Sequence, residues 1–157
     1  MYYLTVILLM FVLPVGSALL ELSVFQGAHG FVRVFGRWFV FWAMGVRLLL
    51  AGIRQVFQPR FTAQTILGTK SEDSLHVVQE LGFANMSMGA IAVLSFPFGA
   101  WVMPSAIAGC LFYGLAGARH VVQKNKNALE NTAMVSDLFI FVVLAAYVII
   151  WFTSGTR

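Results

Sequence analysis

The chain has 157 residues and a formal net charge of +4, from ten Lys and Arg against six Asp and Glu. Residues of the set Ala, Val, Ile, Leu, Met, Phe, Trp, Tyr and Cys make up 60%, charged residues make up 10%, and the mean hydropathy is +0.86. A soluble domain carries roughly 25% charged residues, so this composition excludes a soluble globular protein. A single cysteine, Cys110, excludes a disulfide scaffold, and the same numbers argue against disorder and nucleic-acid binding. The chain is therefore expected to be an integral membrane protein.

Long uncharged stretches predict the first transmembrane helices, because each span needs about 20 apolar residues. Residues 1–20 are uncharged and predict a helix over 3–25. We expect this helix to be retained rather than cleaved as a signal peptide, because no basic residue precedes its apolar run. The second predicted helix covers 36–57, and it is the only one with a charge near its middle, Arg47.

The central part of the sequence predicts two helices joined by a tight turn. Residues 81–118 contain no Asp, Glu, Lys, Arg or His, and these 38 residues are too many for one span. Pro97 and Gly99 interrupt the stretch, and both residue types end helices and favour turns. The predicted helices on either side of this turn cover 72–96 and 100–123.

A further uncharged run near the C-terminus predicts the fifth helix, over 133–153. The connection 58–70 mixes apolar and polar residues, which favours a short segment lying on the membrane surface. The predicted fold class is therefore all-α: a polytopic membrane helical bundle of five transmembrane helices that forms a single domain over 1–157.

The distribution of basic residues predicts the orientation in the membrane. With five spans, the N-terminus and the connections 58–71 and 124–132 lie on one side, and the C-terminus lies on the other. Six basic residues fall on the first side and three on the second: Arg54, Arg60, Lys70, Arg119, Lys124 and Lys126 against Arg33, Arg37 and Arg157. Cytoplasmic loops carry the excess of Lys and Arg, so we expect the N-terminal side to be cytoplasmic, in the cell inner (plasma) membrane.

Polar residues of four predicted helices fall at one depth, near the N-terminal side of the membrane. Arg47 lies deeper, and a charge at the centre of a helix costs about 2.5–3.5 kcal/mol on insertion scales, so it is expected to have a partner. If Arg47 and Arg54 pair with Glu80 and Asp137, no net charge is left buried. The candidate ligand-binding residues are Arg47, Arg54, Gln55, Glu80, Asn85, His120 and Asp137.

Two interpretations of this cluster remain open. In one, the residues line a polar chamber for the head of a lipid or a quinone. In the simpler one, they are hydrogen-bonding contacts between helices and Arg side chains that reach toward the interface. Gly82, Asn85 and Gly89 share one stripe of their helix, which favours close packing with Asn85 bonding across it. Glu21 has no evident partner in the sequence.

Sequence motifs give no catalytic or metal site. His-Glu-x-x-His, Cys-x-x-Cys and Gly-x-Ser-x-Gly are all absent from the sequence. Haem ligation across a bundle usually needs paired histidines, and only His120 is well placed, with His76 as a weak second. We therefore predict no catalytic residues and no metal ligands. A non-enzymatic protein is favoured over an enzyme, with quinone as the candidate cofactor.

The segments around Arg47 to Arg54 and "ELGFANMSMGAIAVLS" resemble an uncharacterised family of small bacterial membrane proteins, and are distantly similar to DoxX-like four-helix membrane proteins. The matching positions of the DoxX-like pattern are Ala51, Gly52, Arg54, Pro59, Glu80 and Gly82. Arg54 stands where Lys or His is common, and this chain has an extra N-terminal helix. The resemblance implies a four-helix bundle with one added helix, and it implies no catalytic residue. Some DoxX-like proteins are subunits of quinone-linked oxidoreductases.

Three functions follow as hypotheses. The first is a small membrane accessory or assembly protein whose polar cluster binds a lipid, a quinone or a partner helix. The second is a quinone-binding subunit of a membrane oxidoreductase, and the third is a small-solute transporter or channel. Transporters usually have inverted repeats or broken helices, and neither is evident here. The expected partners are membrane lipids, a membrane or peripheral protein, and further copies of the chain; nucleic acid is not expected.

Overall fold

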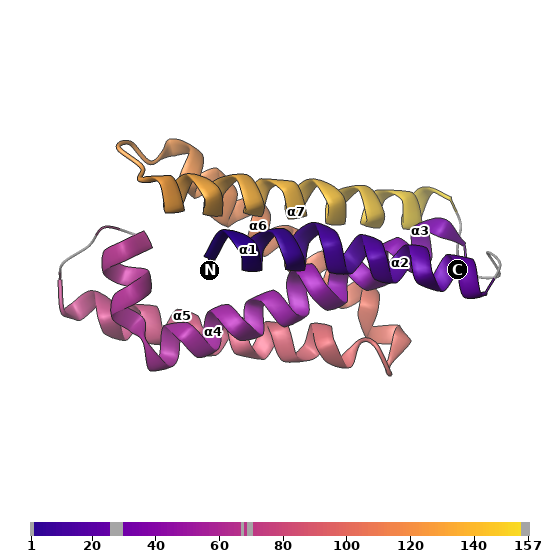
Figure 1. Ribbon diagram of the computed structural model, residues 1–157, viewed down its shortest axis with the longest axis horizontal. Coiled ribbons are helices and arrows are strands. Elements are labelled where there is room, and N and C mark those ends of the chain that lie inside the picture. Colours follow the sequence, from indigo (N-terminus) through magenta and orange to yellow (C-terminus); the bar gives the residue numbers. More distant parts are fainter. Residues whose placement is uncertain (1, 26–29, 67, 69–70, 155–157) are drawn as a thin grey trace.

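The computed structural model of the chain describes residues 2–25, 30–66, 68 and 71–154 (Figure 1). Within these ranges, five helices are long and apolar enough to cross a membrane, and no strand is present. The predicted all-α bundle of five transmembrane helices is therefore confirmed, and the chain is a multi-pass membrane protein.

The first two spans each consist of α-helix interrupted by a wider π-helical stretch. The first is built from α1 (Tyr2–Ile7), η1 (Leu8–Val12) and α2 (Leu13–Val24), and the second from α3 (Phe31–Phe39), η2 (Val40–Val46) and α4 (Arg47–Phe57). A short π-helical segment follows, η3 (Phe61–Ile66). The remaining spans are α5 (Asp73–Leu94), α6 (Val102–Val122), which a 3-10 turn precedes at η4 (Gly99–Trp101), and α7 (Ala128–Thr153).

The predicted boundaries of two helices need correction. The second span begins at Phe31 rather than at 36, and the fifth begins at Ala128 rather than at 133. The added first turn of α7 contains Glu130, whose carboxylate lies 3.3 Å from the His120 ring. The added residues of α3 precede Arg37. Arg37 of α3 forms an ion pair with Glu21 of α2, whose carboxylate also accepts a hydrogen bond of 2.7 Å from the Trp38 indole N–H. Glu21 therefore has partners that the sequence did not reveal.

The second span packs against all four of the others. It is the most buried of the five, with 44% of its apolar window buried against at most 28% in the others. In Figure 1, α4 and α5 run side by side along one edge, α6 and α7 run side by side along the other, and the first span lies between them in this view. Outward-facing residues such as Leu50, Leu115 and Val142 are large, apolar and exposed, as lipid contact requires.

Glycine contacts bring the paired helices close together. A Cβ atom on Gly52 of α4 would lie 2.6 Å from the carbonyl oxygen of Gly82 on α5, and one on Gly89 would lie 2.7 Å from the backbone nitrogen of Leu49. On α6, a Cβ atom on Gly117 would lie 2.6 Å from Leu138 of α7. The predicted close-packing stripe on the third span is confirmed. It sets the second and third spans at the distance from which their polar side chains meet.

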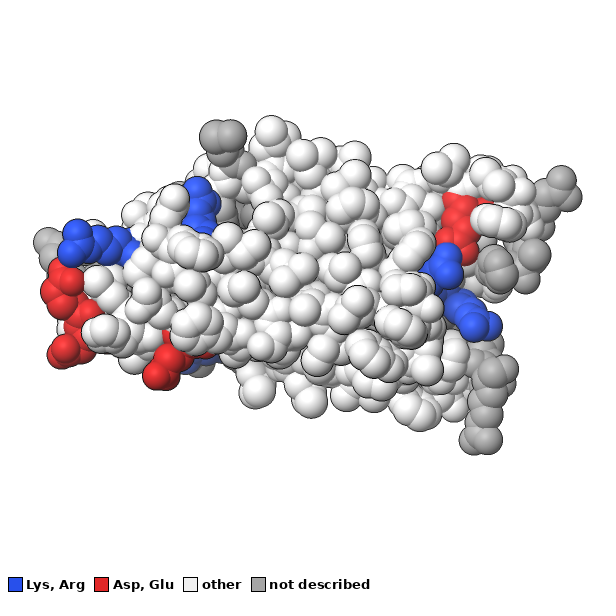
Figure 2. Space-filling model, turned by 90° about the horizontal axis from the view of Figure 1, so that it is seen from below, with Lys and Arg blue, Asp and Glu red and all other residues white. Residues whose placement is uncertain are grey.

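Charged side chains gather at the ends of the bundle. Figure 2 shows Lys, Arg, Asp and Glu at the two ends of the face in view, with a broad band of other residues between them. This band is the part of the surface that faces the hydrocarbon region in a multi-pass membrane protein. Among the described residues, buried acids lie at separate places inside the bundle: Glu21 pairs with Arg37, and Asp137 and Glu130 have partners of their own.

Candidate functional site

Arg47 forms a buried ion pair that joins the second span to the fifth. Its Nη2 atom donates hydrogen bonds to Ser136 Oγ at 2.7 Å and to Asp137 Oδ1 at 2.9 Å. The two charged side chains are 14% and 12% exposed. The guanidinium also lies over the Tyr113 ring, 5.1 Å from its centroid. Arg47 thus has the partner that its depth required, and both charges are compensated within the protein.

The π-helical stretch η2 comes directly before Arg47 in the second span. In a π-turn the usual i to i−4 hydrogen-bond pattern is broken, and such turns often mark functional sites. The Tyr113 hydroxyl of α6 donates a hydrogen bond of 3.1 Å to the carbonyl of Ala43, within η2. Regular α-helix resumes at Arg47. Tyr113 therefore binds the backbone just before Arg47 and also packs its ring against the guanidinium.

A buried amide pair lies one level closer to the end of the bundle. The Asn85 Nδ2 atom of α5 donates to the Gln55 Oε1 atom of α4 at 2.7 Å, and the two residues are 3% and 8% exposed. The predicted hydrogen bond from Asn85 across the helix contact is confirmed. The Asn85 Oδ1 atom is buried and has no hydrogen-bond partner among the described residues.

His120 pairs with an acid that sequence reasoning missed. Its Nδ1 atom lies 3.3 Å from Glu130 Oε1, and Glu130 is 4% exposed. Glu130 occupies the first turn of α7, where its backbone N–H donates to the Asn127 side chain at 2.9 Å. An Asn followed three residues later by Glu is a known signature of a helix start, so this signal was present in the sequence.

Arg54 lies near the end of α4 under the segment η3. Its guanidinium stacks 4.1 Å from the centroid of the Phe61 ring. No carboxylate of the described residues lies within 4.0 Å of it. The segment η3 folds against the end of the bundle: its Thr62 is buried, and its Thr65 carbonyl accepts a 3.1 Å hydrogen bond from the Asn127 amide.

Glu80 does not join this cluster, and the expected charge balance of two Arg against Glu80 and Asp137 is wrong. Glu80 is exposed on the surface of α5 and lines no described cavity. The buried stripe of α5 includes Gly82 and Asn85. Glu80 precedes Gly82 by two residues, about 200° around a helix, so its side chain points away from the neighbouring helix. The direction of this side chain was therefore predicted incorrectly.

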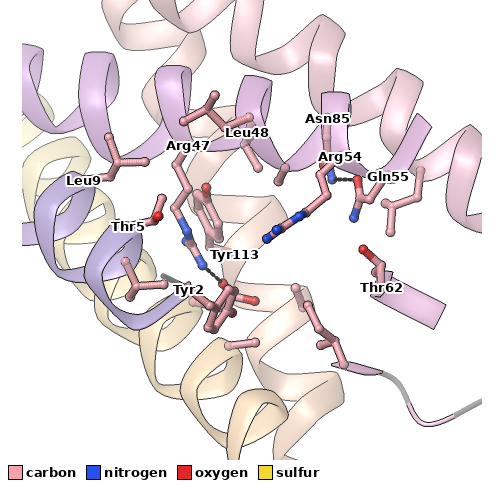
Figure 3. Close-up of a pocket in the computed structure, with 18 of the residues that line it drawn as sticks. Tyr2, Thr5, Leu9, Arg47, Leu48, Arg54, Gln55, Thr62, Asn85 and Tyr113 are labelled. Atoms are coloured by element: carbon pink, nitrogen blue, oxygen red, sulfur yellow. Dashed lines mark hydrogen bonds and ion pairs between the residues drawn. The ribbon is translucent and has the colours of Figure 1, made fainter. Parts of the chain in front are cut away.

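The other six candidate residues line one cavity of about 270 Å³. Its walls come from the first span, α4, η3, α5, α6 and α7. The polar part is formed by Tyr2, Thr5, Arg47, Arg54, Gln55, Thr62, Asn85, Tyr113, His120 and Asp137, and the apolar part includes Leu9, Leu48, Ile66, Leu81 and Phe112. Figure 3 shows Arg47 and Arg54 extending from α4 into the same space, with Tyr113 between them. Sequence reasoning missed the contributions of Tyr2, Thr5 and Thr62, which are unremarkable residues in the chain.

The polar lining of this cavity is rich in hydrogen-bond donors. Two guanidinium groups, two amides and an imidazole supply hydrogen-bond donors and positive charge. Among the residues that the structure describes, no group of three His, Cys, Asp or Glu side chains lies close enough together to hold a metal ion. An amphipathic molecule with a polar head matches the mixture of lining residues.

A model of the family described as "Family of unknown function (DUF6790)" matches residues 4–157, so the chain belongs to this family. No curated protein and no solved structure matches the chain.

Proposed function

We propose that this protein is a small, non-enzymatic accessory protein of the membrane that binds one amphipathic lipid in its intramembrane cavity. The observation that carries the proposal is the cavity itself, where Arg47, Arg54 and Asn85 meet apolar walls in a space of about 270 Å³. Polar groups inside a membrane are costly, so a cluster larger than helix contacts require favours a bound ligand. The ion pair and the amide pair account for part of the cluster as contacts between helices. Arg54, which is exposed in the last turn of α4 and lines the same cavity, belongs to neither pair.

A groove lies beside the cavity and shares one lining residue with it. Val6 lines both the cavity and a second space of about 340 Å³, whose other lining residues include Phe11, Val135 and Phe139. Phe11 and Val135 are exposed on the outer surface of the bundle, where acyl chains lie. The helix α1 between the two spaces has no buried residue. A lipid tail in this groove would keep its contact with the bilayer while its head occupies the cavity.

Native mass spectrometry of the protein released from its own membrane tests the proposal. We expect the wild-type protein to retain one lipid-sized molecule. The Ala116→Phe variant fills part of the cavity and should lose it. The Leu115→Phe variant places the same ring on the outer face of α6, where Leu115 is 73% exposed, and should retain it. Thermal unfolding of both variants checks that each is folded. Equal retention by the folded variants would contradict the proposal, as would a wild-type protein that carries no small molecule.

A quinone-binding subunit of a membrane oxidoreductase is the second candidate. Its support is the aromatic lining of the cavity, where the rings of Phe61, Phe112 and Tyr113 offer faces to a flat head group. The DoxX-like resemblance around Ala51 and Gly52 supports the same candidate, because some DoxX-like proteins work with quinones. A quinone extracted in stoichiometric amount with the purified protein is the result that would favour it.

We also propose that the cavity opens toward the cytoplasmic side of the inner membrane. The support is the excess of basic residues at that end, which holds Arg60, Arg119, Lys124 and Lys126 besides Arg54. A reporter fused to the C-terminus should be inactive if it requires the cytoplasm. Cytoplasmic activity of that reporter would reverse the orientation.

A further inference from the structure

The described lining of the cavity carries an excess of positive charge. It contains two guanidinium groups, from Arg47 and Arg54, and one carboxylate, from Asp137. That carboxylate is bound to Arg47 at 2.9 Å. Arg54 is seven residues further along α4, about 10 Å along the axis. It is an exposed residue, and its guanidinium lies 4.1 Å from the centroid of the Phe61 ring. One cationic group in the cavity therefore lacks a counter-charge among the described residues.

Two buried atoms of the same lining also lack hydrogen-bond partners within the described part of the chain. They are the Arg47 Nη1 atom, which is a donor, and the Asn85 Oδ1 atom, which is an acceptor. Asn85 is 3% exposed, and its other amide atom is fixed by Gln55. An unpaired buried polar atom is destabilising, and such atoms are rare in folded proteins. A ligand that accepts from the guanidinium groups and donates to an amide oxygen would satisfy both.

We infer that the cavity selects a phospholipid whose headgroup carries a net negative charge and a hydroxyl group. This inference rests on the proposed lipid-binding function and narrows its ligand class. The phosphate oxyanion accepts from Arg54 and from the free nitrogen of Arg47, and the hydroxyl donates to Asn85. Charge-assisted hydrogen bonds from Arg are stronger than neutral ones and match phosphate geometry. The acyl chains lie against the apolar walls and the neighbouring groove.

The position of Arg54 favours this occupant over its alternatives. An Arg that only reaches for the membrane surface extends away from the bundle, whereas Arg54 points into the cavity beside Tyr113 (Figure 3). A quinone head is neutral and accepts hydrogen bonds at its carbonyl oxygens. It therefore supplies neither a counter-charge for Arg54 nor a hydrogen-bond donor for the Asn85 Oδ1 atom. An anionic headgroup with a hydroxyl supplies the counter-charge and the donor.

The test measures lipid preference with purified full-length protein. Detergent-solubilised protein is incubated with an equimolar mixture of phosphatidylglycerol and phosphatidylcholine that have identical acyl chains, and native mass spectrometry counts each bound lipid. We expect the wild-type protein to retain phosphatidylglycerol about tenfold more than phosphatidylcholine, the factor that corresponds to one charge-assisted hydrogen bond. Arg54→Gln should reduce this preference to near unity, and Arg54→Lys should keep part of it.

Matched variants and a free anion complete the design. Arg119→Gln removes an exposed Arg at the same end and should leave the preference unchanged. Among the described residues, the Arg119 side chain bonds Gln123, just after the end of α6. Equal retention of both lipids, or a preference that survives Arg54→Gln, would overturn the anionic headgroup and leave lipid binding intact. Retention of neither lipid would overturn the proposed function as well. Inorganic phosphate that raises the unfolding temperature in lipid-free detergent, without any phosphatidylglycerol retention, would assign the site to a free anion and overturn the lipid.

Discussion

Replacing Arg47 by Leu is expected to lower the free energy of unfolding by about 3–5 kcal/mol, because it leaves Asp137 as an uncompensated buried charge. The reason lies in the 2.9 Å contact between the two side chains, which are 14% and 12% exposed. Asp137→Leu should have a similar effect, since it leaves Arg47 unpaired. Thermal or denaturant unfolding in detergent, followed by Trp fluorescence, measures both changes.

The double variant separates the ion pair from simple packing. Replacing both Arg47 and Asp137 by Leu should restore most of the lost stability, because a buried pair exchanged for apolar residues is often neutral. The control is the surface pair of Arg60 and Glu72, which are 69% and 68% exposed at 3.6 Å; single changes there should cost less than about 1 kcal/mol. Glu80→Leu should also have little effect. Additive losses in the double variant would show that the pair is not coupled.

Adding one methyl group at Gly52 is expected to destabilise the bundle by about 1–3 kcal/mol, the usual cost of overpacking. The new Cβ atom of Gly52→Ala would lie 2.6 Å from the carbonyl oxygen of Gly82 and 2.8 Å from the backbone nitrogen of Met86. Backbone atoms cannot move aside as a flexible side chain does, so α4 and α5 must separate. The same displacement would pull Gln55 away from Asn85, and binding to the cavity should weaken together with the unfolding temperature.

Gly16→Ala is the matched control for this change. Gly16 lies in α2, and a Cβ atom there would meet nothing within 4 Å. Because Ala favours helix over Gly by about 1 kcal/mol, this variant should be as stable as the wild-type protein or more stable. If both variants unfold at the same temperature, the close approach of α4 and α5 is not what holds these helices together.

The sequence was sufficient for the number of spans, the turn at Pro97 and Gly99, and the small-residue contact between the second and third spans. These features depend on length, composition and residue size, which can be read one helix at a time. The sequence also pointed to a partner for Arg47, because a charge inside a span needs an opposite charge and Asp137 lies in the N-terminal part of the fifth span.

The features that the sequence did not predict depend on which way each side chain faces and on how the helices pack. Glu80 and Asn85 lie on the same helix near the same depth, but only the packing of α5 against α4 decides which of them faces the cavity. The π-helical stretch η2 changes the helical register ahead of Arg47. The residue types in Val40–Val46 do not predict a π-helix. The fold of η3 over the end of the bundle depends on hydrogen bonds from Asn127, which is 62 residues from Thr65 in the chain.

The most direct test of the cavity is photo-crosslinking with a phosphatidylglycerol whose acyl chain carries a diazirine close to the glycerol. The lipid is incorporated into nanodiscs with the protein, and the modified residues are identified by mass spectrometry of peptides. We predict adducts on cavity residues such as Phe61 and Phe112, which excess unlabelled phosphatidylglycerol suppresses. Adducts confined to outward-facing residues such as Leu115 and Val142, with no competition, would contradict a lipid bound inside the bundle.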